Sequence, residues 1–102
     1  MPPLERKEIM LALQHAHIGE IYPAIRCIVF DYNADTKSFL LRWYLDREVT
    51  DDDKESISVV VSLFISHFKF SDFDELKEEC IYSIKPVREL DMLDGCIYLR
   101  RE

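Results

Sequence analysis

The segment of residues 50–68, TDDDKESISVVVSLFISHF, constrains the fold more than any other part of the sequence. Thr50 is a typical N-cap residue, and Asp53 stands three positions later, where a capping box places its acidic residue. Apolar residues then recur with the 3.6-residue period of a helix, at Ile57, Val60, Val61, Phe64 and Phe68. The helix contains three consecutive valines, which are poor helix formers, so packing against the rest of the fold must stabilise it.

Further apolar residues widen this stripe beyond one helix face. They are Val59, Leu63 and Ile65. We therefore expect the helix over residues 50–68 to be covered on more than one side.

The composition fits one domain over residues 1–102, with 48% hydrophobic residues to build its core. A chain of this length buries about two-thirds of the surface that its unfolded form exposes. No run of 18 apolar residues is present, so we expect no membrane span. The first ten residues, MPPLERKEIM, lack the apolar centre of a signal peptide, so we expect a cytoplasmic protein.

Two strands with alternating apolar residues follow a first helix. That helix is predicted over residues 4–17, with Gly19 as its C-cap, and the strands over residues 24–32 and 38–46, joined by a polar hairpin turn. In the first strand we expect Ile25, Cys27 and Val29 to share one face. In the second, one face is continuously apolar: Phe39, Leu41, Trp43 and Leu45.

The C-terminal third contains an acidic connection and two further strands. The connection covers residues 71–79, and the strands cover residues 80–84 and 96–101, with a start of the first of these strands at Glu78 as the alternative. With the central helix between the two strand pairs, the order is αββαββ. This order predicts an α+β fold in which two helices pack on one face of an antiparallel sheet.

The three cysteines, Cys27, Cys80 and Cys96, are widely spaced and lie in apolar, strand-like runs. We interpret them as buried reduced thiols, with a disulfide between strands as the less favoured alternative in the cytosol. No C-x-x-C pair is present, and His15 and His17 point away from each other on a helix. We therefore predict neither a metal site nor a cofactor.

No sequence motif of a known catalytic class is present. The chain has no G-x-S-x-G, P-loop or glycine-rich phosphate cradle. Its composition leaves a Cys–His nucleophile pair open, but burial would disfavour the thiolate that such a pair needs. We therefore expect a protein that is not an enzyme.

The formal net charge of −7 disfavours direct binding of nucleic acid, because phosphates require a basic surface. An acidic protein is steered toward basic partners instead. The alternative is that the acidity serves solubility alone.

Two candidate surfaces follow from the pattern of charges and aromatic residues. The first is an acidic run that exceeds what a helix cap needs: Asp46, Glu48, Asp51, Asp52, Asp53 and Glu55. The second is the mixed face of the sheet: Arg26, Arg42 and Tyr44, with Tyr82, Tyr98 and Arg100 from a second hairpin. Tyr and Arg are favoured at interfaces, but their stems also cover sheets without any partner.

Three stretches of the chain resemble a group of short bacterial proteins: LALQHAHIGEIYPAIRCI, SFLLRWYLDREVTDDDKES and DGCIYLRRE. The shared motifs are LQ-x-A-x-x-GE-I-x-P-x-x-R and Y-x-D-x-E…D-x-ES. The matching residues are Leu13, Gln14, Ala16, Gly19, Glu20, Ile21, Pro23, Arg26, Tyr44, Asp46, Glu48, Asp53, Glu55 and Ser56. The group is similar to the immunity proteins of contact-dependent growth inhibition systems.

This resemblance implies a cytosolic protein that binds the C-terminal toxin domain of a neighbour's effector and blocks it. The expected partner is a cognate toxin domain, a basic nuclease in many such systems, with no nucleic acid or membrane bound directly. The predicted toxin-binding residues are the acidic run together with Tyr44 and Arg42. The alternative is a self-associating structural or regulatory protein, and the choice between monomer and homodimer stays open.

Overall fold

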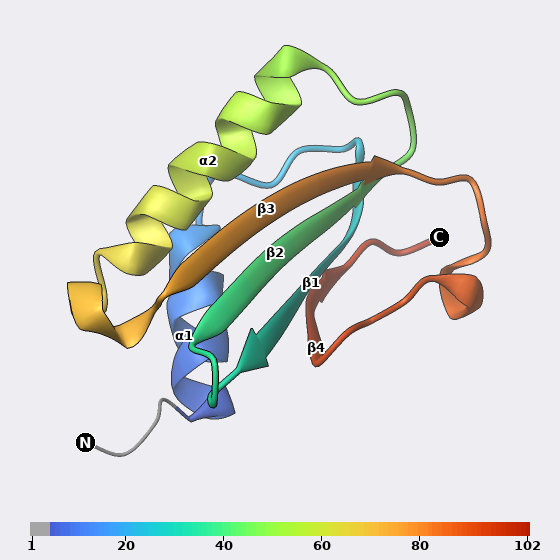
Figure 1. The fold of residues 1–102 in the computed structure, drawn as a ribbon. Coiled ribbons are helices and arrows are strands. Elements are labelled where there is room, and N and C mark those ends of the chain that lie inside the picture. Colours follow the sequence, from blue (N-terminus) through green and yellow to red (C-terminus); the bar gives the residue numbers. More distant parts are fainter. Residues whose placement is uncertain (1–4) are drawn as a thin grey trace.

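The computed structural model describes residues 5–102, so the expected helix start at residue 4 lies outside the described part (Figure 1). Its elements are α1 (Arg6–Ala16), β1 (Ile25–Asn33), β2 (Ser38–Leu45), α2 (Asp51–Ile65), a 3-10 turn (Phe70–Asp72), β3 (Glu75–Tyr82), a second 3-10 turn (Val87–Glu89) and β4 (Gly95–Leu99). The α+β class and the order αββαββ are confirmed. Gly19, expected just beyond the first helix, has a φ of 79°, in the left-handed region that glycine tolerates.

The sheet is mixed rather than antiparallel throughout. Its strand order is β3-β2-β1-β4, with β1 antiparallel to both β2 and β4. β3 runs parallel to β2 from the pair Ser38–Glu75 to the pair Leu45–Tyr82. The physical reason is that α2 carries the chain back along the sheet, so β3 starts beside the start of β2.

The prediction that the last two strands form a second hairpin is therefore wrong, because β3 and β4 lie at opposite edges of the sheet. β3 also begins at Glu75, within the predicted acidic connection. Its first four residues, Glu-Leu-Lys-Glu, are all exposed, as is common in an edge strand, where charged side chains discourage pairing with other chains.

Both helices pack on one face of the sheet, as expected (Figure 1). The apolar side of β2, from Phe39 to Leu45, meets residues of both helices in one buried cluster. The rings of Phe39 and Phe64 stack there with centroids 4.5 Å apart. The N-terminal end of β2 therefore packs on the C-terminal end of α2, in addition to the packing near Leu45.

The opposite face of the sheet is covered by the segment between β3 and β4. Leu90 from this segment packs on Cys27, Val29 and Tyr44. Ile25 was expected on this face but belongs to the helix-side cluster, because the register of β1 shifts between Ile25 and Cys27. A bulge of this kind reverses the face on which the following side chains lie.

All three cysteines are free thiols, and Cys27 is fully buried while Cys80 and Cys96 are half-buried. The Cys27 sulfur lies 3.6 Å from the sulfurs of both Cys96 and Met92. Burial raises the pKa of the Cys27 thiol to about 12 and that of Cys80 to about 11. Both thiols are therefore protonated at neutral pH, a poor state for a nucleophile.

His17 is buried between α1 and β2 with both ring nitrogens engaged. Trp43 Nε1 donates to His17 Nε2 over 3.1 Å, so Nε2 carries no proton. Nδ1 lies 2.7 Å from the carbonyl oxygen of Leu13 and is therefore the protonated nitrogen. Burial lowers the pKa of His17, since the charged ring would lose its solvation.

We predict that the stability of the protein falls as the pH drops below about 6.5, where His17 of the unfolded chain begins to bind a proton that the folded chain excludes. The slope contributed by this residue is at most about 1.4 kcal/mol per pH unit. Urea unfolding of wild type and His17→Gln at several pH values between neutral and acidic measures it. The variant should lose stability less steeply than wild type, and equal slopes would show that His17 does not carry the effect.

Candidate functional site

Thr50 and Asp53 cap the N-terminus of α2 as a capping box. The Thr50 hydroxyl oxygen accepts from the backbone N–H of Asp53 over 3.2 Å, and the Asp53 carboxylate accepts from the backbone N–H of Thr50 over 2.8 Å. This local geometry is the one that the sequence predicts. It satisfies two N–H groups at the helix entrance.

Asp53 is buried, with 2% of its side chain exposed, and it is bound by residues outside the capping box. Arg47 donates to both carboxylate oxygens, over 2.6 and 3.0 Å, and the Tyr22 hydroxyl donates to one of them. The Arg47 guanidinium holds the pKa of Asp53 well below its usual range. Burial and the bond to Asp53 raise the pKa of Tyr22, so the phenol keeps its proton.

Asp53 therefore has a structural role and is not part of the exposed acidic surface. We remove it from the candidate contact residues, because a partner would have to displace Arg47 and Tyr22 to reach it. Asp46 is exposed, but its carboxylate pairs with Arg100 over 2.7 Å, which offsets its charge.

The other four predicted acids lie on the surface around the first turns of α2. They are Glu48, Asp51, Asp52 and Glu55. Within residues 5–102, no ion pair or side-chain hydrogen bond engages these four carboxylates. The positive end of the helix dipole stabilises anions here, but no internal cation neutralises them.

The structure does not bring Arg42 and Tyr44 together with these acids. Tyr44 is buried on the sheet face opposite the helices, where its hydroxyl donates to the carbonyl oxygen of Asp91 over 2.8 Å. Arg42 is half-buried and donates to Glu79 over 2.8 Å and to the Tyr44 hydroxyl over 3.2 Å. Tyr44 fastens the covering segment to the sheet and Arg42 joins β2 to β3, so we also remove both from the contact residues.

The mixed sheet face predicted as a second surface is divided by this fold. Arg26 is 5% exposed, and its guanidinium bonds to Glu102 and to the Ser83 carbonyl oxygen. Arg100 and Tyr98 are half-buried near one edge, and Tyr82 is exposed near the other. The six residues therefore form no common surface.

The helix layer carries an exposed apolar surface that the sequence pattern did not predict. Leu11 and Ile18 are 58% and 71% exposed, and Val59 and Leu63 are 46% and 44% exposed. The expectation that α2 is covered on more than one side is therefore wrong for Val59 and Leu63. The α1–α2 contact covers only one side of the wide apolar stripe.

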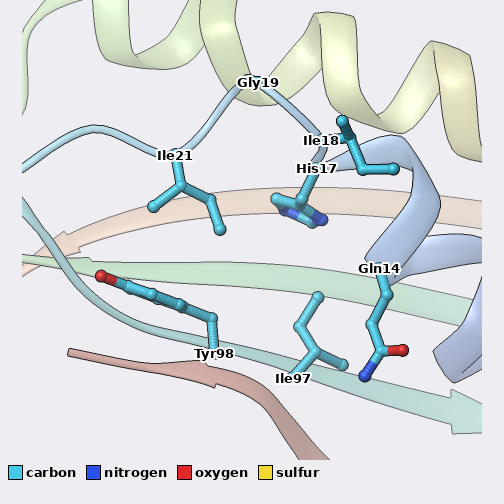
Figure 2. A pocket seen from close by; sticks show the side chains of 7 residues that line it. All are labelled: Gln14, His17, Ile18, Gly19, Ile21, Ile97 and Tyr98. Carbon is cyan, nitrogen blue, oxygen red and sulfur yellow. The ribbon is translucent and has the colours of Figure 1, made fainter.

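Among residues 5–102, neighbouring hollows lie along this layer. One of about 480 Å³ runs between α1 and the segment that follows α2 and is lined by Glu8, Leu11, Ala12, His15, His67 and Phe68. The next, of about 410 Å³, is lined by His15, Ala16, Ile18, Leu63, Ser66 and His67. The third, of about 490 Å³, lies between the end of α1 and β4 and is lined by Gln14, His17, Ile18, Gly19, Ile21, Ile97 and Tyr98 (Figure 2).

The described part of the chain offers no group of three or more His, Cys, Asp or Glu side chains arranged to hold a metal ion. Across residues 5–102, every helix is too short or too polar to cross a membrane.

We predict that Asp53→Asn destabilises the fold, since it removes the charge from buried hydrogen bonds to Arg47, Tyr22 and Thr50. The expected loss is about 2–3 kcal/mol, typical of charge-assisted hydrogen bonds. Urea unfolding of both variants measures it, with the exposed Asp52→Asn as the matched control, expected within about 0.5 kcal/mol of wild type. Equal stabilities of the two variants would contradict the structural role given to Asp53.

Comparison with known proteins gives one family. The sequence model of the MafI2 immunity protein family matches residues 6–102, which include both helices and every strand described above. No curated protein matches the sequence. The match confirms the expected class, an immunity protein, without naming a contact-dependent growth inhibition system. The chain belongs to the MafI2 immunity protein family.

Proposed function

We propose that this immunity protein binds and blocks the C-terminal toxin domain of an effector from a contact-dependent growth inhibition system. The family match supports the class of function, neutralisation of a cognate toxin. The type of delivery system and the chemistry of the toxin are our inference, and they rest on the sequence resemblance and on the charge of the surface.

The observation that supports the proposal is that only some of the acidic residues near α2 form ion pairs within the protein. Asp53 and Asp46 are paired with Arg47 and Arg100, whereas Glu48, Asp51, Asp52 and Glu55 face solvent without a cation. The first group is neutralised within the fold, and the second is not. The four free carboxylates suit a partner that presents Lys or Arg side chains.

A basic nuclease fits this requirement. Such an enzyme binds phosphates with Lys and Arg, and carboxylates placed against the same side chains would compete with nucleic acid for them. The proposed mechanism is stoichiometric occlusion of the toxin, without a catalytic step. A toxin that acts on nucleic acid works in the cytoplasm, so we place the immunity protein there.

Self-association is the second candidate, because β3 and β4 leave two unpaired sheet edges. The residues of the edge strand β3 argue against self-association. This strand carries Glu75, Lys77, Glu78 and Glu79 along its length, and charged side chains discourage pairing between copies.

We predict that the triple variant Asp51→Asn, Asp52→Asn, Glu55→Gln associates with the toxin on the order of tenfold more slowly at low salt, because it removes electrostatic steering. The probe is a catalytically inactive form of the cognate toxin domain, which we expect at the C-terminus of a large secreted protein encoded directly upstream. Stopped-flow association at about 50 mM and about 500 mM salt measures the effect, which screening should remove at the higher concentration.

The control removes three exposed acids elsewhere: Asp35→Asn, Asp74→Asn and Glu89→Gln. It changes the net charge by the same amount, so any effect of total charge appears in both variants. An equal slowing of both triples would show that the acids at α2 have no special part in the encounter.

A further inference from the structure

We infer that the toxin contact is centred on an apolar stripe of the helix layer, formed by Leu11, Ile18, Val59 and Leu63, with the free carboxylates of α2 as its rim. This inference rests on the proposed function and specifies which surface performs it. The partner it fits is a protein surface with apolar side chains bordered by Lys or Arg.

The exposure of these four side chains is the first observation. Ile18 is 71% exposed, Leu11 is 58% exposed, and Val59 and Leu63 are nearly half exposed. A single exposed leucine is ordinary, but a contiguous group of them marks interaction surfaces in many proteins.

The stripe is contiguous because neighbouring hollows share their walls. Ile18 and Leu63 line one hollow together with His15 and His67. The same two histidines line the next hollow, which reaches Leu11, and their rings lie 5.1 Å apart, one on α1 and one just after α2.

Ile18 also extends the surface toward the sheet. It lines the hollow between the end of α1 and β4, where Ile21 from the segment after α1 faces Ile97 and Tyr98 from β4 (Figure 2). Ile18 thus stands between two hollows of about 410 and 490 Å³, each large enough for a partner's side chains.

The acids continue this surface along α2. Glu55 precedes Val59 by four residues, Val59 precedes Leu63 by four, and Asp52 precedes Val59 by seven, so all four lie on one exposed side of the helix. An apolar centre with a charged rim is the usual anatomy of a protein interface.

Charge identifies the occupant as the basic toxin rather than a second copy. The rim carries Asp52 and Glu55 without internal cations, and Glu8 lines the opposite end of the surface. Two copies meeting through this face would bring carboxylates of like sign together, whereas a basic partner would neutralise them.

The test compares Ile18→Ser, Leu63→Ser with a control that changes two exposed side chains outside the stripe, Tyr82→Ser, Ile84→Ser. Circular dichroism and urea unfolding confirm that each variant is folded. Binding to the inactive toxin domain is then measured by surface plasmon resonance. We expect the stripe variant to bind about 30-fold more weakly or worse, through faster dissociation, as for central anchor residues.

The control should bind like wild type, and the association rate of the stripe variant should keep its salt dependence. If wild type binds and the stripe variant binds equally well, or the control weakens binding as much, the inference is wrong and the proposed function stands. If wild type fails to bind, both fail. If light scattering shows a wild-type dimer that Ile18→Ser, Leu63→Ser separates, the stripe serves a second copy and the inference is wrong.

Discussion

The buried carboxylate of Asp53 is the interaction on which the rest of the structure depends. It joins three parts of the chain: the capping turn at Thr50, the β2–α2 connection through Arg47, and the segment after α1 through Tyr22. A charge with 2% exposure is costly to desolvate unless it is paired and fully hydrogen-bonded, and here it is both. The bonds fix where α2 starts, and therefore where its side chains meet the sheet.

This constraint separates the acids of one short segment into two groups with different uses. Asp53 points inward and stabilises the helix entrance, while Asp51, Asp52 and Glu55 point outward from the same turns. The outward acids share their helix face with Val59 and Leu63, so one helix supplies core residues on one side and a charged, partly apolar surface on the other. An immunity protein needs both, because its contact surface must be held rigidly enough to match one toxin.

The local features could be predicted from the sequence, and the non-local ones could not. Helical and strand periodicity located α1, β1, β2 and α2, and the pair Thr50–Asp53 predicted the capping box. Tyr22 lies 31 residues from Asp53, so no local rule predicts their contact. The parallel pairing of β3 was not predicted, because a run of exposed charged residues is typical of a connecting loop. Such residues are also common in edge strands, where they discourage pairing with other chains.

The candidate site shows the same limit. Exposure of Glu48, Asp51, Asp52 and Glu55 follows from their charge, whereas the burial of Tyr44 depends on the segment around Leu90, which periodicity does not place. The width of the apolar stripe on α2 suggested cover on more than one side, but only the structure shows that α1 leaves Leu63 open.

Hydrogen exchange of the free protein and of its complex with the inactive toxin domain tests the central claim most directly, because it reports the contact surface without any substitution. We predict slower exchange on binding in residues 11–22 and 51–66, with β3 and the segment of residues 86–94 unchanged. Slower exchange confined to β3 or to residues 86–94 would place the toxin on another face and contradict the account.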